Sequence, residues 1–195
     1  VSKLSLKFFY NDIDSLNTLF KKNKNKIAAV ILEPTNFVKP KKNFLHDVKE
    51  LCRKNSCLLI FDEVITGFRM SLGGAQKFFG VTPDLSCIGK AMANGFPISA
   101  VTGKKKYMEI FDEIFFSFTF GGETSSIAAS LATIEEIKKR GTINYVNKYG
   151  EKMKSEFNLL TSKFGIEKFV RMTGYGWWPL LCFFDENNKP SKLLE

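Results

Sequence analysis

One lysine and one acidic pair in this chain have a spacing that could support carbonyl–amine chemistry. Lys90 follows a short apolar segment and a glycine, and Asp62 and Glu63 close an apolar run at 58–61, with 28 residues from Asp62 to Lys90 (90 minus 62). A lysine amine can form a Schiff base with an aldehyde cofactor. A carboxylate can hold the ring nitrogen of such a cofactor in its protonated form. The pair therefore indicates an enzyme rather than an α/β domain without chemistry.

Three apolar runs would position these residues. They lie at 27–32, 57–61 and 85–88 and have the length of strands. Uninterrupted apolar runs are typical of parallel strands that are buried on both faces. Ligands bind beyond the carboxyl ends of such strands. Because Glu33 and Asp62 each follow a run and Lys90 follows the third, we expect all three to face one crevice.

The order of the elements predicts an α/β fold. Strand and helix patterns alternate over about the first 140 residues, which is typical of a mostly parallel sheet between helices. We assign residues 1–145 to this larger domain. Residues 146–195 are predicted as a linking helix and the start of a small α+β domain. We also predict strands at 115–118 and, with a bend, at 169–184. The chain begins at Val1 and ends soon after a turn, so we expect a fragment of a longer protein.

The charge of the chain is strongly positive. There are 29 lysines and arginines against 20 acidic residues, which gives a net charge of +9. Lysines cluster at 21–26, 39–42 and 104–106, a pattern that could bind nucleic acid. The clusters lie at predicted element boundaries and no aromatic residues interleave them. We therefore interpret them as solvated surface and expect no nucleic-acid partner.

Cysteine spacing and hydropathy bear on metal binding and on cellular location. The four cysteines show no CxxC spacing and the chain has one histidine, so we expect no zinc site. We expect no signal peptide, and the sequence has no apolar run of membrane-spanning length. We expect a cytoplasmic protein with reduced thiols and no membrane partner.

The acidic pair also resembles the second motif of an ATPase, in which the acid holds magnesium. That function requires a phosphate loop of the form GxxxxGK[ST]. At the Gly89–Lys90 step, Asp84 stands where the first glycine should be and Ala91 where the hydroxyl should be. The sequence therefore does not support an ATPase.

Four segments together resemble a known family. They are 28–34 (AAVILEP), 61–69 (FDEVITGFR), 83–90 (PDLSCIGK) and 118–123 (FTFGGE). In this order they resemble the class III aminotransferases, which are pyridoxal-phosphate enzymes of fold type I. The segment 10–16 (YNDIDSL) and the Gly-Gly-Glu variant look closest to the branch that contains glutamate-1-semialdehyde 2,1-aminomutase. The resemblance covers nearly the whole chain.

The resemblance implies a role for each of five residues. Lys90 would form the Schiff base with pyridoxal 5'-phosphate and, once released, would move a proton. Asp62 would pair with the ring nitrogen, and Val64 would pack on the ring face. Thr119 would bind cofactor phosphate in the neighbouring subunit of a homodimer, and Asn36 would reach the ring hydroxyl. The family's own phosphate turn and stacking aromatic are expected outside the chain.

Two residues near the predicted site have less specific interpretations. Glu33 would orient a loop or a substrate group. Arg69 is expected to form a structural ion pair rather than to bind a substrate carboxylate.

Three functions remain open at this point. The first is transfer of an amino group between an amino donor and a carbonyl acceptor. The second is an intramolecular amino shift, as in the aminomutase. The third is a basic binding module without catalysis, whose affinity for nucleic acid would fall steeply with salt.

Overall fold

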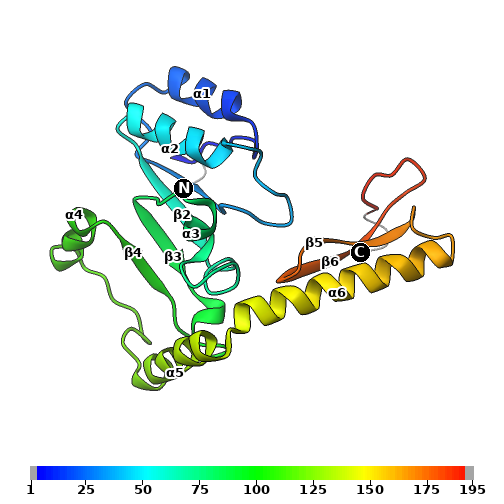
Figure 1. Cartoon of the computed structure of the whole chain (residues 1–195). Coiled ribbons are helices and arrows are strands. Elements are labelled where there is room, and N and C mark those ends of the chain that lie inside the picture. The colour runs from blue at the N-terminus through cyan, green and yellow to red at the C-terminus, as the bar shows by residue number, and fades with distance from the viewer. Residues whose placement is uncertain (1–3, 192–195) are drawn as a thin grey trace. The chain divides into compact units, whose positions relative to one another are not determined.

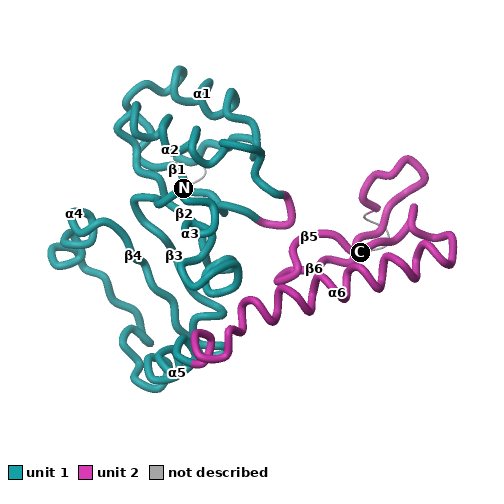
Figure 2. Tube along the Cα trace, viewed as in Figure 1, with its two compact units in different colours: residues 1–35, 39–135 teal, residues 36–38, 136–195 magenta. Residues whose placement is uncertain are grey.

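The computed structural model describes residues 4–191 and divides them into two compact units (Figure 2). Within the described residues, the first unit covers the chain up to Thr35 and residues 39–135. The second unit covers residues 36–38 and the chain from Glu136 onward. The division at 135/136 precedes the domain limit predicted at 145/146. The assignment of large and small domains stays a prediction.

A four-stranded sheet forms the centre of the first unit (Figure 1). Its strands are β1 (Ala29–Leu32), β2 (Leu58–Glu63), β3 (Leu85–Ile88) and β4 (Ala100–Gly103), in that spatial order. The pairs β1–β2 and β2–β3 are parallel, and β4 is antiparallel to β3. The predicted α/β class with a mostly parallel sheet is confirmed.

Three helices pack with the sheet in this unit: α1 (Ile13–Lys22), α2 (Phe44–Lys54) and α3 (Gly74–Phe79). Leu16 of α1 and Val48 of α2 are almost fully buried in one core with Phe61 of β2. Burial of such side chains supplies most of the stabilising free energy of a domain of this kind.

The expectation that the first strand is buried on both faces was wrong. In β1, Val30 and Leu32 are buried while Ile31 is 59% exposed. Successive strand residues point to opposite faces, so the core covers one face only. An uninterrupted apolar run does not reveal this difference between the two faces.

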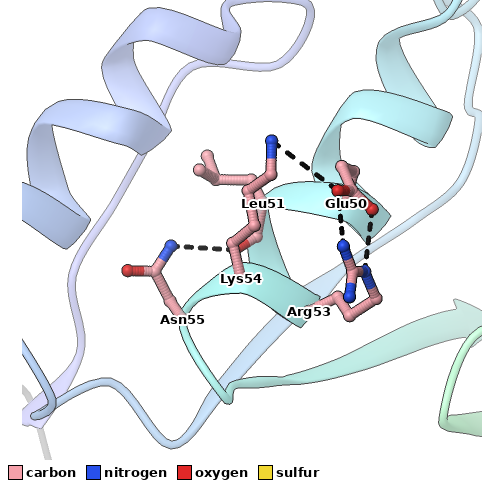
Figure 3. A network of polar contacts seen from close by, with 5 residues as sticks. All are labelled: Glu50, Leu51, Arg53, Lys54 and Asn55. Carbon is pink, nitrogen blue, oxygen red and sulfur yellow. Dashed lines mark hydrogen bonds and ion pairs between the residues drawn. The ribbon is translucent and has the colours of Figure 1, made fainter.

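The end of α2 carries a surface network of polar contacts (Figure 3). The guanidinium of Arg53 donates to both carboxylate oxygens of Glu50, and Lys54 pairs with Glu50 at 3.6 Å. These contacts, the hydrogen bond from Arg53 first, lower the pKa of Glu50 to about 2. Asn55 Nδ2 donates to the Leu51 carbonyl at 2.8 Å and so closes the helix. All three charged groups are exposed, so the network adds little stability.

The segment between β4 and the next long helix is irregular. It contains α4 (Lys105–Met108) and a short 3₁₀ helix, η3 (Glu109–Asp112), and it leads to α5 (Thr124–Arg140). The strand predicted at 115–118 is not formed. Phe115 is 95% exposed, and within the described residues no strand pairs with this segment.

The second unit contains α6 (Thr142–Lys163) and a hairpin of β5 (Val170–Tyr175) and β6 (Trp178–Phe183). The single bent strand predicted at 169–184 is therefore wrong. The two strands reverse direction at Gly176, where a side-chain carbon would overlap the Asn147 carbonyl oxygen of α6. Because only glycine fits there, the helix and the turn pack backbone to backbone.

The two tryptophans at this turn pack within the same unit. The Trp177 ring stacks on Tyr175 at 5.3 Å between centroids, and Trp178 meets Phe37 edge to face at 6.3 Å. Among the described residues, no helix combines the length and the apolar character needed to cross a bilayer.

Candidate active site

The carboxyl ends of the three parallel strands meet at one edge of the sheet. Leu32 pairs with Phe61, Asp62 with Cys87, and Glu63 with Ile88. Glu33 and Asp62 thus stand at the ends of neighbouring strands. Lys90 lies two residues beyond the last pair, so the structure brings the predicted lysine and acid to the same edge.

Lys90 has a strained backbone. Its φ is +43°, a region that residues with a side chain rarely adopt, and it begins the 3₁₀ helix η2 (Lys90–Met92). Such a conformation costs about 1–3 kcal/mol and clusters at functional sites. The side chain is exposed, and its Nζ has no hydrogen bond or ion pair with residues 4–191. The amine is therefore free to react.

One oxygen of the Asp62 carboxylate accepts a hydrogen bond. Its Oδ1 accepts from the backbone N–H of Val64 at 3.0 Å, and Oδ2 has no donor within the described part of the chain. The side chain is half-buried. Burial, and then the charge of Asp62, raise the pKa of the Cys87 thiol on the neighbouring strand. A half-buried carboxylate with a free oxygen suits a protonated ring nitrogen.

Val64 lies two residues after Asp62 and close to Gly89, the residue before Lys90. Its Cγ1 is 3.7 Å from the point where a side-chain carbon on Gly89 would lie, immediately before Lys90. The half-buried valine thus presents an apolar surface beside Asp62 and next to the lysine, as packing against a ring requires.

Thr119 lies in an exposed turn of the same unit before α5. Its neighbours Phe118 and Phe120, together with residues 97–99, line a cavity of about 550 Å³. A volume of this size is typical of small-ligand sites. The turn that contains Thr119 and residues 97–99, which follow the Lys90 loop in the sequence, thus border the same space.

Asn36 and Arg69 have local hydrogen bonds. Asn36 belongs to the second unit, and its Oδ1 accepts from the Val38 N–H at 2.8 Å. Arg69 donates to the Ile65 carbonyl at 3.0 Å, and burial lowers the pKa of its guanidinium. Arg69 forms no ion pair with described residues, so the structural ion pair expected for it was wrong.

Glu63 has a role that the sequence analysis missed. It is 1% exposed, and its carboxylate accepts four hydrogen bonds from Thr66, Ala75 and Gln76. Strand alternation could have found it, because it places Glu63 on the face opposite Asp62. The sequence offered no way to identify its partners.

Glu123 fixes the start of α5, which follows the Thr119 turn. Its carboxylate accepts from the N–H groups of Ser125 at 2.8 Å and Ser126 at 2.7 Å. Hydrogen bonds from Ser126, and then from Ser125, lower the pKa of Glu123 to about 2. These bonds occupy two of the four N–H donors that a helix start leaves without partners.

We expect Glu123→Ala to lower the thermal unfolding midpoint by a few degrees at pH 6. The depressed pKa means that the contribution is complete above the unfolded-state pKa near 4.5 and is lost as pH falls toward about 2. Melting curves over this range should show the wild-type and variant midpoints converging. Glu135→Ala, an exposed change within α5, is the control, and a difference independent of pH would contradict the expectation.

Comparison with known proteins identifies the family of the chain. The family model for aminotransferase class-III matches residues 8–178. The chain belongs to the class III aminotransferase family. Among residues 4–191, no group of three or more histidine, cysteine or acidic side chains could hold a metal ion.

Two curated relatives illustrate the range of activities in the family. The chain is 42% identical over 183 residues to the 3-aminobutyryl-CoA aminotransferase of Cloacimonas acidaminovorans (strain Evry), covering 90% of this chain and 44% of the relative. It is 44% identical over 170 residues to the glutamate-1-semialdehyde 2,1-aminomutase of Alkaliphilus oremlandii (strain OhILAs), covering 83% and 40%. The chain thus spans less than half the length of these relatives.

Solved structures confirm the fold as type I. The PLP internal aldimine form of the FumI protein of Sphingopyxis sp. MTA144 matches with a TM-score of 0.87 and 28% identity, over 93% of this chain and 45% of that one. An omega-transaminase from Sphaerobacter thermophilus matches with a TM-score of 0.78 and 29% identity, over 86% and 40%.

Proposed function

We propose that this chain is part of a pyridoxal-phosphate-dependent aminotransferase that moves an amino group from an amino donor to a carbonyl acceptor. One observation carries the proposal. Lys90, with a strained backbone and an exposed side chain, and Asp62, with one carboxylate oxygen free of hydrogen bonds from the described residues, lie at the same edge of the sheet. Family membership supports the same chemistry.

The residues present fit this cofactor. Asp62 would hold the ring nitrogen through its free oxygen, and Val64 would cover the ring face. Lys90 would hold the cofactor covalently through Nζ. When bound, pyridoxal phosphate supplies an electron sink for a carbanion at the substrate carbon. Thr119 would bind the phosphate of the cofactor in a neighbouring subunit. Asn36 would reach the ring hydroxyl of the cofactor.

Lys90 would also act as the proton carrier of the reaction. Once the amine of the substrate has displaced it, the free Lys90 amine would take a proton from the substrate carbon and return it at a second carbon, and a positioned group of this kind contributes about 10²–10⁴-fold to rate. The half-buried Asp62 beside it would keep the ring oriented during both transfers. Water must be excluded for this step, and the exposure of Lys90 and Thr119 in a single chain is consistent with cover from a partner subunit.

Assembly and location follow as parts of the proposal. We propose a cytoplasmic homodimer with the active site at its interface. We also propose that residues 1–145 belong to the large cofactor-binding domain and 146–195 to the linking helix and the small domain.

An intramolecular amino shift is the second candidate, and the 44% identity to an aminomutase favours it. Lys90 and Asp62 would serve both reactions alike. A donor with a labelled amino group separates them, because transfer of the label to a second molecule rules out a pure mutase.

One labelling experiment tests the cofactor and its anchor. The complete gene product is incubated with pyridoxal phosphate, reduced with borohydride and analysed by peptide mass spectrometry. We expect one phosphopyridoxyl group, on Lys90. Labels scattered over the surface lysines of a folded protein would overturn the proposed function.

A further inference from the structure

Glu63 and Asp62 are neighbours on β2 but serve opposite faces of the sheet. Asp62 is half-buried at the candidate site, whereas Glu63 is 1% exposed on the core face. A carboxylate buried so completely is costly unless its oxygens are satisfied. The contacts of Glu63 therefore reveal which part of the structure it holds.

Four donors surround this carboxylate. Oε2 accepts from Thr66 Oγ1 at 2.9 Å and from the Ala75 N–H at 2.5 Å. Oε1 accepts from the Gln76 N–H at 3.1 Å and from Gln76 Nε2 at 3.0 Å. All four donors are uncharged. Because each oxygen faces two donors, only a carboxylate satisfies the arrangement.

The same network reaches β3, the strand that precedes Lys90. Gln76 Nε2 also donates to Ser86 Oγ on β3, at 3.1 Å. Ser86 pairs with Phe61, one step before the pair of Asp62 with Cys87. The bridge from Glu63 through Gln76 thus joins the carboxyl end of β2 to Ser86, two residues before the end of β3, from the core side.

Gly74 shows how closely the chain surrounds the carboxylate. A side-chain carbon on Gly74 would overlap Glu63 Oε2 and lie 2.7 Å from its Cδ, and the φ of Gly74 is +68°. Gly80 has nearly the same φ, +69°, but nothing lies within 4 Å of that point. The two glycines differ in their contact with Glu63 and not in backbone strain.

We propose that Glu63 is a positioning residue for the reaction: it ties the carboxyl end of β2 to β3 through Gln76 and Ser86 and thereby holds Asp62 and Lys90 in register around the cofactor. This rests on the proposed function. Glu63 does not touch the reacting atoms and acts through its neighbours. Displacement of a reacting group by about 1 Å can cost about 10²-fold in rate, so a small loosening at this clamp matters.

The Glu63→Gln variant tests the clamp. In this variant an amide NH₂ replaces one carboxylate oxygen and faces two N–H or O–H donors, which are left without an acceptor. Because the clamp that holds Asp62 and Lys90 is then loosened, we expect the affinity for the cofactor to fall about 10-fold. The pH at which the absorbance of bound cofactor changes should also move, because Asp62 is held less firmly. Exposed Glu113→Gln is the control and should leave both measurements unchanged.

The glycine pair gives an independent test if Glu63→Gln does not fold. We expect Gly74→Ala to weaken cofactor binding and to shift the same absorbance transition, and Gly80→Ala to do neither. A variant that melts earlier but keeps the cofactor affinity and the absorbance transition of the wild type would show a purely structural clamp and overturn the inference.

Borohydride labelling of the wild type distinguishes the two levels of failure. If Lys90 of the wild type takes no label, the proposed function fails and this inference fails with it. If Lys90 is labelled in the wild type and in the variants, and if all of them have the same cofactor affinity and the same absorbance transition, only the inference about Glu63 fails.

Discussion

Lys90→Met is expected to abolish covalent attachment of the cofactor and to lower the rate of amino-group removal from the donor by about 10³-fold or more, because one amine supplies both the anchor and the proton carrier. The thioether has similar length but no proton to exchange. The rate is measured as the change in cofactor absorbance after amino acids are added one at a time. The φ of Lys90 is +43°. Methionine is unbranched at Cβ, like lysine, so it adds no backbone strain there and the fold should persist.

Two comparisons make the Lys90 result specific. Lys49→Met removes an exposed lysine of α2 and should leave labelling and rate unchanged. Adding methylamine to Lys90→Ala should restore part of the rate if the missing function is proton transfer. A Lys90→Met enzyme that keeps a tenth of the wild-type rate would contradict the assignment.

The sheet edge that holds Asp62 and Lys90 was predictable from the sequence for a physical reason. Parallel strands place their carboxyl ends together, so residues that follow successive apolar runs meet without any knowledge of their contacts. The observed register of β2 and β3 confirms that reasoning. The chemical roles of the two residues stay predictions.

Features that depend on partners distant in sequence were not predictable. The backbone donors for Glu63 come from Ala75 and Gln76, and no local pattern connects them with β2. The phenylalanines at 115–118 have strand propensity, but a strand forms only where a neighbouring edge is available. The reversal at Gly176 depends on close contact with Asn147 of α6, which the sequence of the turn does not show.

Asp62→Asn is expected to keep the fold and the Lys90 label but to slow the reaction by about 10²–10³-fold, within the range that a single positioned charge contributes. The Val64 N–H donates to Oδ1 at 3.0 Å, so the amide oxygen of the substituted side chain would keep that place and its NH₂ would face the cofactor ring. An NH₂ group cannot accept a hydrogen bond from a protonated ring nitrogen, so the electron sink is weakened. The exposed change Asp112→Asn is the control.

A modified cofactor separates the charge of the ring from the position of the acid. With Asp62→Ala, which leaves space, a cofactor methylated at the ring nitrogen is permanently cationic and needs no carboxylate to retain a proton. We expect it to restore much of the lost rate in this variant and to inhibit the wild type, where the methyl group meets the carboxylate. If the methylated cofactor gives no recovery although it binds and labels Lys90, Asp62 has a role other than holding the ring nitrogen in its charged form.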